Sequence, residues 1–146
     1  MANFRVVSVK SGKVLDVTGG SLINGANIQQ WDWWGGPNQK WSFDHLGNIS
    51  GRDVYSIICQ ASFKALDLTV AGNVLDNGVN VQQWDWWGAA NQLWYLIPVG
   101  DGSNKIQSVL SWKVLDVTGQ SMDNGANIQV WDDWNGPNQH WRLEEV

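Results

Sequence analysis

The sequence predicts an all-β domain with threefold internal pseudo-symmetry, built from about twelve short strands. One unit of about 48 residues occurs three times, over roughly residues 1–48, 49–100 and 101–146. Glycines and Asn-Gly pairs interrupt the chain roughly every 8 to 12 residues, which leaves no window for a regular helix. A single unit cannot bury its own apolar face, so three units must pack around a shared axis. Short antiparallel strands in three such units are typical of a β-trefoil.

Four motifs define the repeat. Each unit contains an apolar tetrapeptide with aspartate at its third position, an Asn-Gly pair, a Gln-x-Trp-Asp segment and a closing Asn-Gln-x-Trp segment. The tetrapeptides span residues 14–17, 65–68 and 114–117, and the Asn-Gly pairs span 24–25, 77–78 and 124–125. The Gln-x-Trp-Asp segments are 29–32, 82–85 and 129–132, and the closing segments are 38–41, 91–94 and 138–141. No Pro- or Ser-rich linker separates the units, so we expect one domain over residues 1–146.

The strands of the first unit follow from its residue types. Phe4–Val9, Val14–Val17, Asn27–Trp31 and Gln39–Phe43 mix β-branched, aromatic and alternating polar residues, as strands do. An Asn-Gly pair favours a type I′ turn, because both central residues of that turn need positive φ. We therefore expect a tight hairpin at each pair.

Composition excludes several function classes. The net charge of −5 and the absence of a Lys/Arg cluster argue against nucleic acid and against anionic membrane surfaces as partners. No apolar stretch is long enough to span a membrane, and the first residues do not resemble a secretory signal, so we expect a cytoplasmic protein. The single cysteine, Cys59, lies in an apolar segment and is predicted to be a buried residue. The sequence leaves open whether the chain forms a homodimer.

The repeated residues divide into core and candidate site. The last tryptophan of each unit and the leucine before each repeated aspartate are predicted to be core; these are Trp41, Trp94, Trp141, Leu15, Leu66 and Leu115. The repeated aspartates lie on the opposite face of their strands from those leucines. Further tryptophans follow in a glycine-rich loop, where a core cannot readily absorb them, and loops carry function. This Asp/Trp/Asn set indicates ligand contact, with packing between units as the alternative.

Neutral sugars fit this set of side chains. The apolar face of a pyranose can lie flat on an indole ring. A carboxylate accepts strong charge-assisted hydrogen bonds from vicinal hydroxyls, and an Asn amide adds a donor and an acceptor. Galactose-type sugars suit best, because their axial hydroxyl leaves one face continuous and apolar. Twelve tryptophans in one small domain favour the same interpretation.

The repeated motif resembles that of the ricin B-chain type of lectin, the QxW β-trefoil family, over the whole chain. It is closest in character to small fungal members that lack a toxin or enzyme partner. The resemblance implies galactose- or N-acetylgalactosamine-containing glycans and glycoproteins as partners, no cofactor, no metal and no insertion into membranes. It also implies an aspartate, a stacking aromatic and an asparagine at each site: Asp16, Trp31 and Asn38; Asp67, Trp84 and Asn91; Asp116, Trp131 and Asn138.

The resemblance also implies supporting glutamines for each site, and the loops of this sequence offer further candidates. The first glutamine lines or braces the site and the second supports it from behind: Gln29, Gln82 and Gln129, then Gln39, Gln92 and Gln139. A second tryptophan in each loop is an alternative stacking platform: Trp34, Trp87 and Trp134. The backbone of the next residue can also approach the sugar: Gly35, Gly88 and Asn135. The second unit is longer before its Asn-Gly pair and has Ala89-Ala90 where the others have Gly-Pro, so the sites are expected to differ in affinity.

The sequence also bears on three other functions. A glycoside hydrolase needs two carboxylates in different environments, for which Asp16 with Asp32 is the candidate pair, but this pair occurs in all three units. The two histidines, His45 and His140, have no repeated partners, so neither a catalytic triad nor a metal site is indicated. We therefore expect no enzymatic activity. A β-trefoil protease inhibitor would not require a threefold site, whereas a xylan-type polysaccharide-binding module would differ only in the sugar that fits.

Overall fold

A computed structural model describes residues 2–146, which form twelve β-strands and five single-turn 3-10 segments. The strands are β1 Phe4–Ser8, β2 Val14–Val17, β3 Ile28–Trp31, β4 Trp41–Ile49, β5 Arg52–Cys59, β6 Ala65–Leu68, β7 Val81–Trp84, β8 Trp94–Pro98, β9 Asn104–Ser108, β10 Val114–Val117, β11 Ile128–Trp131 and β12 Trp141–Glu145. The 3-10 segments are η1 Thr18–Gly20, η2 Pro37–Gln39, η3 Ala90–Gln92, η4 Thr118–Gln120 and η5 Pro137–Gln139. The all-β prediction is confirmed. Residues 2–146 contain no helix of the length and apolarity needed to cross a bilayer.

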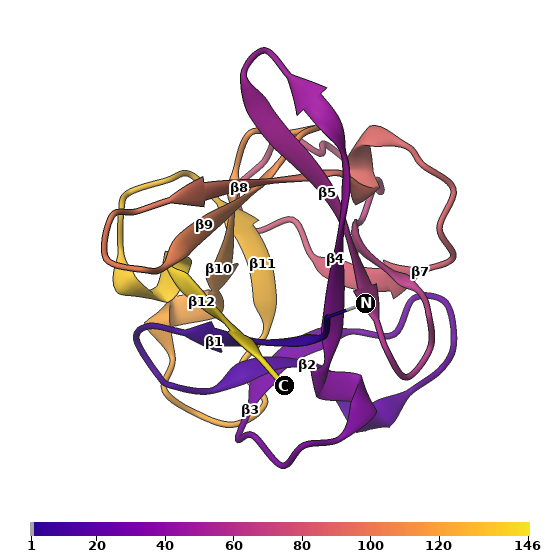
Figure 1. The fold of residues 1–146 in the computed structure, drawn as a ribbon, viewed down its shortest axis with the longest axis vertical. Helices are drawn as coiled ribbons and strands as arrows, with labels where there is room; N and C mark the ends of the chain where they lie inside the picture. The colour runs from indigo at the N-terminus through magenta and orange to yellow at the C-terminus, as the bar shows by residue number, and fades with distance from the viewer. Residues whose placement is uncertain (1) are drawn as a thin grey trace.

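Six strands close into a barrel, and the other six form three hairpins that cover one end of it (Figure 1). Antiparallel pairing runs around the barrel in the order β1, β4, β5, β8, β9, β12 and back to β1. The covering hairpins are β2–β3, β6–β7 and β10–β11. Each of the three units contributes four consecutive strands, which is the arrangement of a β-trefoil. Closing the barrel leaves its strands without free edges.

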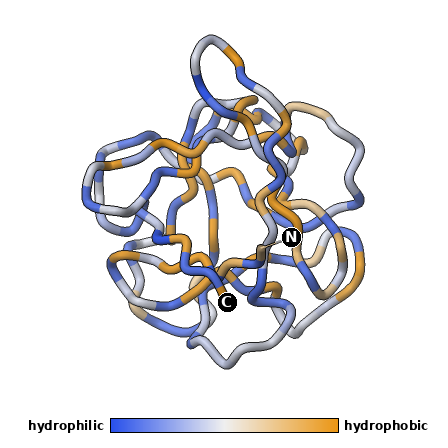
Figure 2. The backbone as a smooth tube through the Cα atoms, viewed as in Figure 1, coloured by the Kyte–Doolittle hydropathy of each residue, from blue (hydrophilic) through white to orange (hydrophobic). Residues whose placement is uncertain are grey.

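The core fills the barrel and the space beneath the hairpins. Trp41, Trp94 and Trp141 are completely buried, as predicted, and Figure 2 shows hydrophobic segments along the strands that surround this space. Each indole Nε1–H donates a hydrogen bond to a hairpin carbonyl, and the acceptors are Leu15 at 3.2 Å, Leu66 at 3.0 Å and Leu115 at 3.1 Å. The polar edge of each buried ring is therefore satisfied, and it ties the barrel to a covering hairpin.

The three hairpins are joined at the pseudo-threefold axis by a ring of side-chain amides. Asn27 donates to Asn127 at 2.8 Å, Asn127 donates to Asn80 at 2.9 Å, and Asn80 donates back to Asn27 at 2.9 Å. Each amide therefore gives one hydrogen bond and accepts one, so the polar groups satisfy each other where the units meet. The ring fixes the hairpins relative to one another.

Two local predictions are wrong. Gln39 lies in the 3-10 turn η2, and the strand begins only at Trp41. In the Asn-Gly pairs only the glycine has positive φ, 85° at Gly25, so the turns are not type I′. The physical reason is that each pair ends a long connection between two strands. Its asparagine side chain bonds to the neighbouring unit, as at Asn24 with Asp85, so contacts between units decide the backbone there.

Candidate functional site

Three similar pockets lie on the covering hairpins, one in each unit. Their volumes are about 400, 240 and 260 Å³ for the first, second and third units. Each is lined by the repeated aspartate, the first glutamine, both candidate tryptophans and the asparagine. The first site contains Asp16, Gln29, Trp31, Trp34 and Asn38; the second contains Asp67, Gln82, Trp84, Trp87 and Asn91; the third contains Asp116, Gln129, Trp131, Trp134 and Asn138.

Two glutamine amides hold the carboxylate at the floor of each pocket. In the first site Gln29 donates to Oδ1 of Asp16 at 3.0 Å and Gln39 donates to Oδ2 at 2.9 Å. The corresponding distances are 3.0 and 2.9 Å at Asp67 and 3.1 and 2.9 Å at Asp116. Each carboxylate oxygen can accept two hydrogen bonds, so each has a further lone pair for a hydroxyl group.

The second glutamine of each unit also shapes the loop above the pocket. Gln39 is fully buried and accepts a hydrogen bond from the backbone N–H of Trp34 at 2.9 Å. Its amide also donates to the carbonyl oxygen of Asp32 at 2.8 Å. These two bonds between side chain and backbone tie down the turn that follows β3. One side chain therefore fixes both the carboxylate and the loop that carries the tryptophans.

Burial determines the electrostatics of the three carboxylates. Desolvation raises the pKa of Asp16 above its ordinary value of 3.8, and the hydrogen bonds from Gln29 and Gln39 oppose this rise. The pKa values of Asp67 and Asp116 are raised in the same way. A ligand that donates hydrogen bonds to the ionised form would replace part of the lost hydration.

The asparagine of each site is buried, and that of the third site has a free acceptor beside the pocket. Its amide donates to the carbonyl at the end of the aspartate-bearing strand, as from Asn138 to Val117 at 3.1 Å. The Oδ1 atom of Asn138 is buried and has no hydrogen-bond partner among residues 2–146. An unsatisfied buried acceptor beside a pocket is costly, and a ligand hydroxyl would satisfy it.

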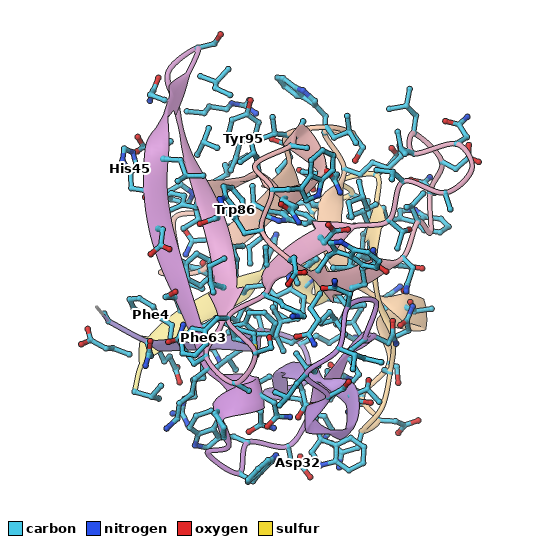
Figure 3. The ribbon with its side chains drawn as sticks, turned by 90° about the vertical axis from the view of Figure 1, so that its right-hand side faces the viewer. Phe4, Asp32, His45, Phe63, Trp86 and Tyr95 are labelled. Carbon is cyan, nitrogen blue, oxygen red and sulfur yellow. The ribbon has the colours of Figure 1, made fainter. Side chains whose placement is uncertain are left out.

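Both tryptophans of each unit contribute to the pocket. The side chain of Trp31 is 39% exposed and that of Trp34 is 63% exposed. The first ends a strand and the second follows in the loop from β3 to η2, which also carries Asp32 at the lower edge of the molecule in Figure 3. Each site therefore presents two indole rings, and both candidate stacking platforms line the pocket.

The three sites differ at their rims. The ring of Trp34 lies over Gly36, and that of Trp134 lies over Gly136, so closely that a Cβ on either glycine would overlap the ring. In the second unit the equivalent residue is Ala89, so Trp87 cannot take the same position. The second pocket is also bordered by Val70, whereas the third is bordered by Gln120.

Some predicted residues do not line the pockets, and some lining residues escaped prediction. Gly35, Gly88 and Asn135 lie outside the three linings, and the buried Gln39, Gln92 and Gln139 act from behind. Asn135 instead contacts His140, with 3.0 Å between Oδ1 and Nε2. The residues missed follow the aspartate-bearing strand directly: Thr18, Gly19, Gly20, Val70, Gly119 and Gln120. Their position two to four residues after the aspartate was the available signal.

The second carboxylate of the candidate hydrolase pair, Asp32, is engaged by other side chains. Within residues 2–146 no three His, Cys, Asp or Glu side chains gather as metal ligands do. The carboxylate of Asp32 is paired with Lys13 at 2.9 Å. Its pKa is lowered, first by the hydrogen bond from Asn124 and then by that from Lys13, which is the wrong direction for a proton donor at neutral pH.

Comparison with known proteins gives consistent results. Residues 2–84, 47–131 and 90–146 match the family model of the ricin-type beta-trefoil lectin domain-like proteins. No curated protein sequence matches the chain. The designed 3-fold symmetric protein ThreeFoil has a TM-score of 0.93 at 38% identity, with 99% of each chain covered.

Two natural proteins of known structure are also similar. The exo-beta-1,3-galactanase 1,3Gal43A of Clostridium thermocellum has a TM-score of 0.92 at 36% identity; the match covers 100% of this chain and 30% of the galactanase chain. The C-half of the earthworm R-type lectin, solved in complex with GalNAc, has a TM-score of 0.77 at 26% identity, and both chains are covered completely.

Proposed function

The chain belongs to the ricin-type β-trefoil lectin domain-like family, and on that premise we propose that it binds galactose- or N-acetylgalactosamine-type glycans at three similar sites. The observation that carries this proposal is the buried carboxylate at the floor of each pocket, held by two amides and flanked by indole rings. Its remaining lone pairs point to a ligand that presents two neighbouring hydroxyl groups. A sugar ring supplies these hydroxyls together with an apolar face for the indoles.

Galactose-type sugars are the proposed class because of how their hydroxyls are arranged. An axial hydroxyl next to an equatorial one reaches a carboxylate from one edge and leaves the opposite ring face apolar. Two of the similar structures support this class: one is an exo-beta-1,3-galactanase and the other was solved with GalNAc. The chain corresponds to 30% of the galactanase chain, so an attached catalytic domain is not part of this proposal.

Binding without cleavage is proposed for the same site. Hydrolysis requires a protonated carboxyl near the glycosidic oxygen and a second carboxylate opposite it. Of the candidate pair, Asp16 is held by two amides, and Asp32 is bonded to Lys13 and Asn124. Incubation with a chromogenic galactoside tests this point, and release of the chromophore would contradict it.

Three sites on one chain make a multivalent lectin part of the proposal. A shallow sugar site of this kind binds with a dissociation constant of about 1 mM, or about −4 kcal/mol. Simultaneous engagement of several glycans raises the effective affinity without new contacts. Agglutination of galactose-coated particles, with inhibition by free lactose, measures this property, and its absence would refute multivalent binding.

Calorimetric titration with lactose and with N-acetylgalactosamine is the decisive experiment. The control is a triple variant, Asp16→Asn, Asp67→Asn and Asp116→Asn, which keeps the size of each side chain and removes the charge. We expect two or three sites per chain, with heat lost in the variant. Heat with xylo-oligosaccharides alone would favour a xylan-type module. Heat with none of these sugars would refute the proposal and favour an inhibitor-type β-trefoil.

A further inference from the structure

Each unit reaches across to the pocket of the next unit through the asparagine of its Asn-Gly pair. Oδ1 of Asn124, in the third unit, accepts a hydrogen bond from the backbone N–H of Asp32 at 2.8 Å. Nδ2 of the same side chain donates to Oδ2 of Asp32 at 2.9 Å. Asp32 directly follows Trp31, so this pair of bonds fixes the chain at the edge of the first site.

The same two bonds recur in cyclic order. Asn24 of the first unit accepts from the N–H of Asp85 at 2.8 Å and donates to its carboxylate at 3.0 Å. Asn77 of the second unit bonds to Asp132 with the same two distances. The third unit therefore supports the first site, the first unit supports the second site, and the second unit supports the third site.

The glycine of each pair lies against a tryptophan of the site that its asparagine supports. A Cβ on Gly125 would lie 3.7 Å from Cζ3 of Trp31. The equivalent distances are 3.6 Å between Gly25 and Trp84 and 3.7 Å between Gly78 and Trp131. Backbone hydrogen bonds accompany the contact, as from the N–H of Gly125 to the carbonyl of Gln30 at 2.9 Å. The indole platform of one unit thus packs on the turn of another.

A second path connects the same asparagine to the carboxylate. The carbonyl of Asp32, whose N–H is bonded to Asn124, accepts from Nε2 of Gln39 at 2.8 Å. That Nε2 atom also donates to the carboxylate of Asp16 at 2.9 Å. The position of Asp32 therefore affects the amide that braces the sugar-binding carboxylate.

We propose that Asn24, Asn77 and Asn124 are positioning residues for the glycan site of the neighbouring unit, so that no unit contains a complete site. Each asparagine acts through the Asp and Trp that it fixes and does not itself contact the sugar. The inference rests on the proposed function for its affinity readout. It predicts that a substitution in one unit weakens sugar binding in a different unit, in a fixed direction around the axis.

The test uses two variants that each retain one functional site. Asp67→Asn with Asp116→Asn leaves the first site, and Asp16→Asn with Asp67→Asn leaves the third. Asn124→Ala is introduced into both, and lactose affinity is measured by calorimetry. We expect the first site to weaken by about five- to tenfold, which corresponds to the loss of about one ordinary hydrogen bond, while the third changes less than about twofold.

Asn77→Ala is the matched control, because it removes the same two bonds from Asp132. It should weaken the third site and leave the first unchanged. Equal weakening of both sites by either variant would indicate general destabilisation and overturn the proposal, as would no weakening at all. Asn124 is exposed, so its truncation leaves no cavity in the core.

A readout without sugar separates this inference from the proposed function. The indole N–H signals of Trp31 and Trp131, assigned in ¹H–¹⁵N spectra with Trp→Phe variants, report the platforms directly. Asn124→Ala should shift the Trp31 signal and leave Trp131 in place, and Asn77→Ala should do the reverse. If neither lactose nor N-acetylgalactosamine binds the native protein, the glycan proposal fails; if the indole signals do not follow this pattern, the positioning role fails.

Discussion

Replacing Gln39 by leucine tests how far the site depends on its buried amide brace. The substitution keeps the approximate volume and removes three hydrogen bonds: to Asp16 at 2.9 Å, to the carbonyl of Asp32 at 2.8 Å and from the N–H of Trp34 at 2.9 Å. A bond to a carboxylate contributes about 1.5–3 kcal/mol and each of the others about 1 kcal/mol. We therefore expect the free energy of unfolding to fall by about 4 kcal/mol, a large share of the roughly 5–15 kcal/mol of a typical domain.

The matched control is Gln29→Leu, which removes only the 3.0 Å bond to Oδ1 of the same carboxylate. Its expected cost is about 1.5–3 kcal/mol. Chemical denaturation of the two variants and the native protein measures the difference. The pKa of Asp16 should rise further in both, because each loses a hydrogen bond that lowers it. A Gln39→Leu cost equal to or below that of Gln29→Leu would refute the view that this glutamine couples the carboxylate to the loop.

Three further predictions concern pH, a site rim and a turn. Because burial raises the folded-state pKa of Asp16 above 3.8, the folded protein holds more protons than the unfolded chain between these two pKa values. The contribution of Asp16 to stability therefore falls as pH rises through this window. Calorimetry should show lactose affinity falling on acidification at a pH above 3.8, and loss only below it would contradict the raised pKa. Gly36→Ala should displace the ring of Trp34 and change the sugar affinity of the first site. The stability cost should stay below about 1 kcal/mol, because the second unit accommodates Ala89 at the same position. A crystal structure of the variant with Trp34 unmoved would contradict this prediction. Phe63→Gly should raise the free energy of unfolding by about 0.5–1 kcal/mol, because Phe63 is 72% exposed and has a φ of 57°, which favours glycine. A melting temperature of the variant below that of the native protein would contradict this prediction.

The candidate site was accessible from the sequence because its residues recur at fixed spacing in three units. Each aspartate follows a core leucine, so strand alternation separates the two side chains, and the fully buried Trp41 could be distinguished from Trp31 by its position at the end of the unit. The repeats also indicated the fold, because three similar units that each lack a complete core must pack together. These properties depend on periodicity along the chain, which a sequence displays directly.

The Asn-Gly turns mark where this reasoning fails. Local preference predicts a type I′ turn at Asn124-Gly125, but in the structure Asn124 bonds to Asp32, 92 residues away in the sequence. Likewise, alignment of the units shows only a small change from Gly36 to Ala89. In the structure a Cβ on Gly36 would overlap the ring of Trp34, so Ala89 excludes that ring position in the second unit. The sequence by itself determined the repeat, the core tryptophans and the repeated Asp, Gln, Trp and Asn side chains that line each pocket. Only the tertiary structure decided which unit supports which site, because that depends on how the three units pack around the axis, and no spacing within one unit encodes it.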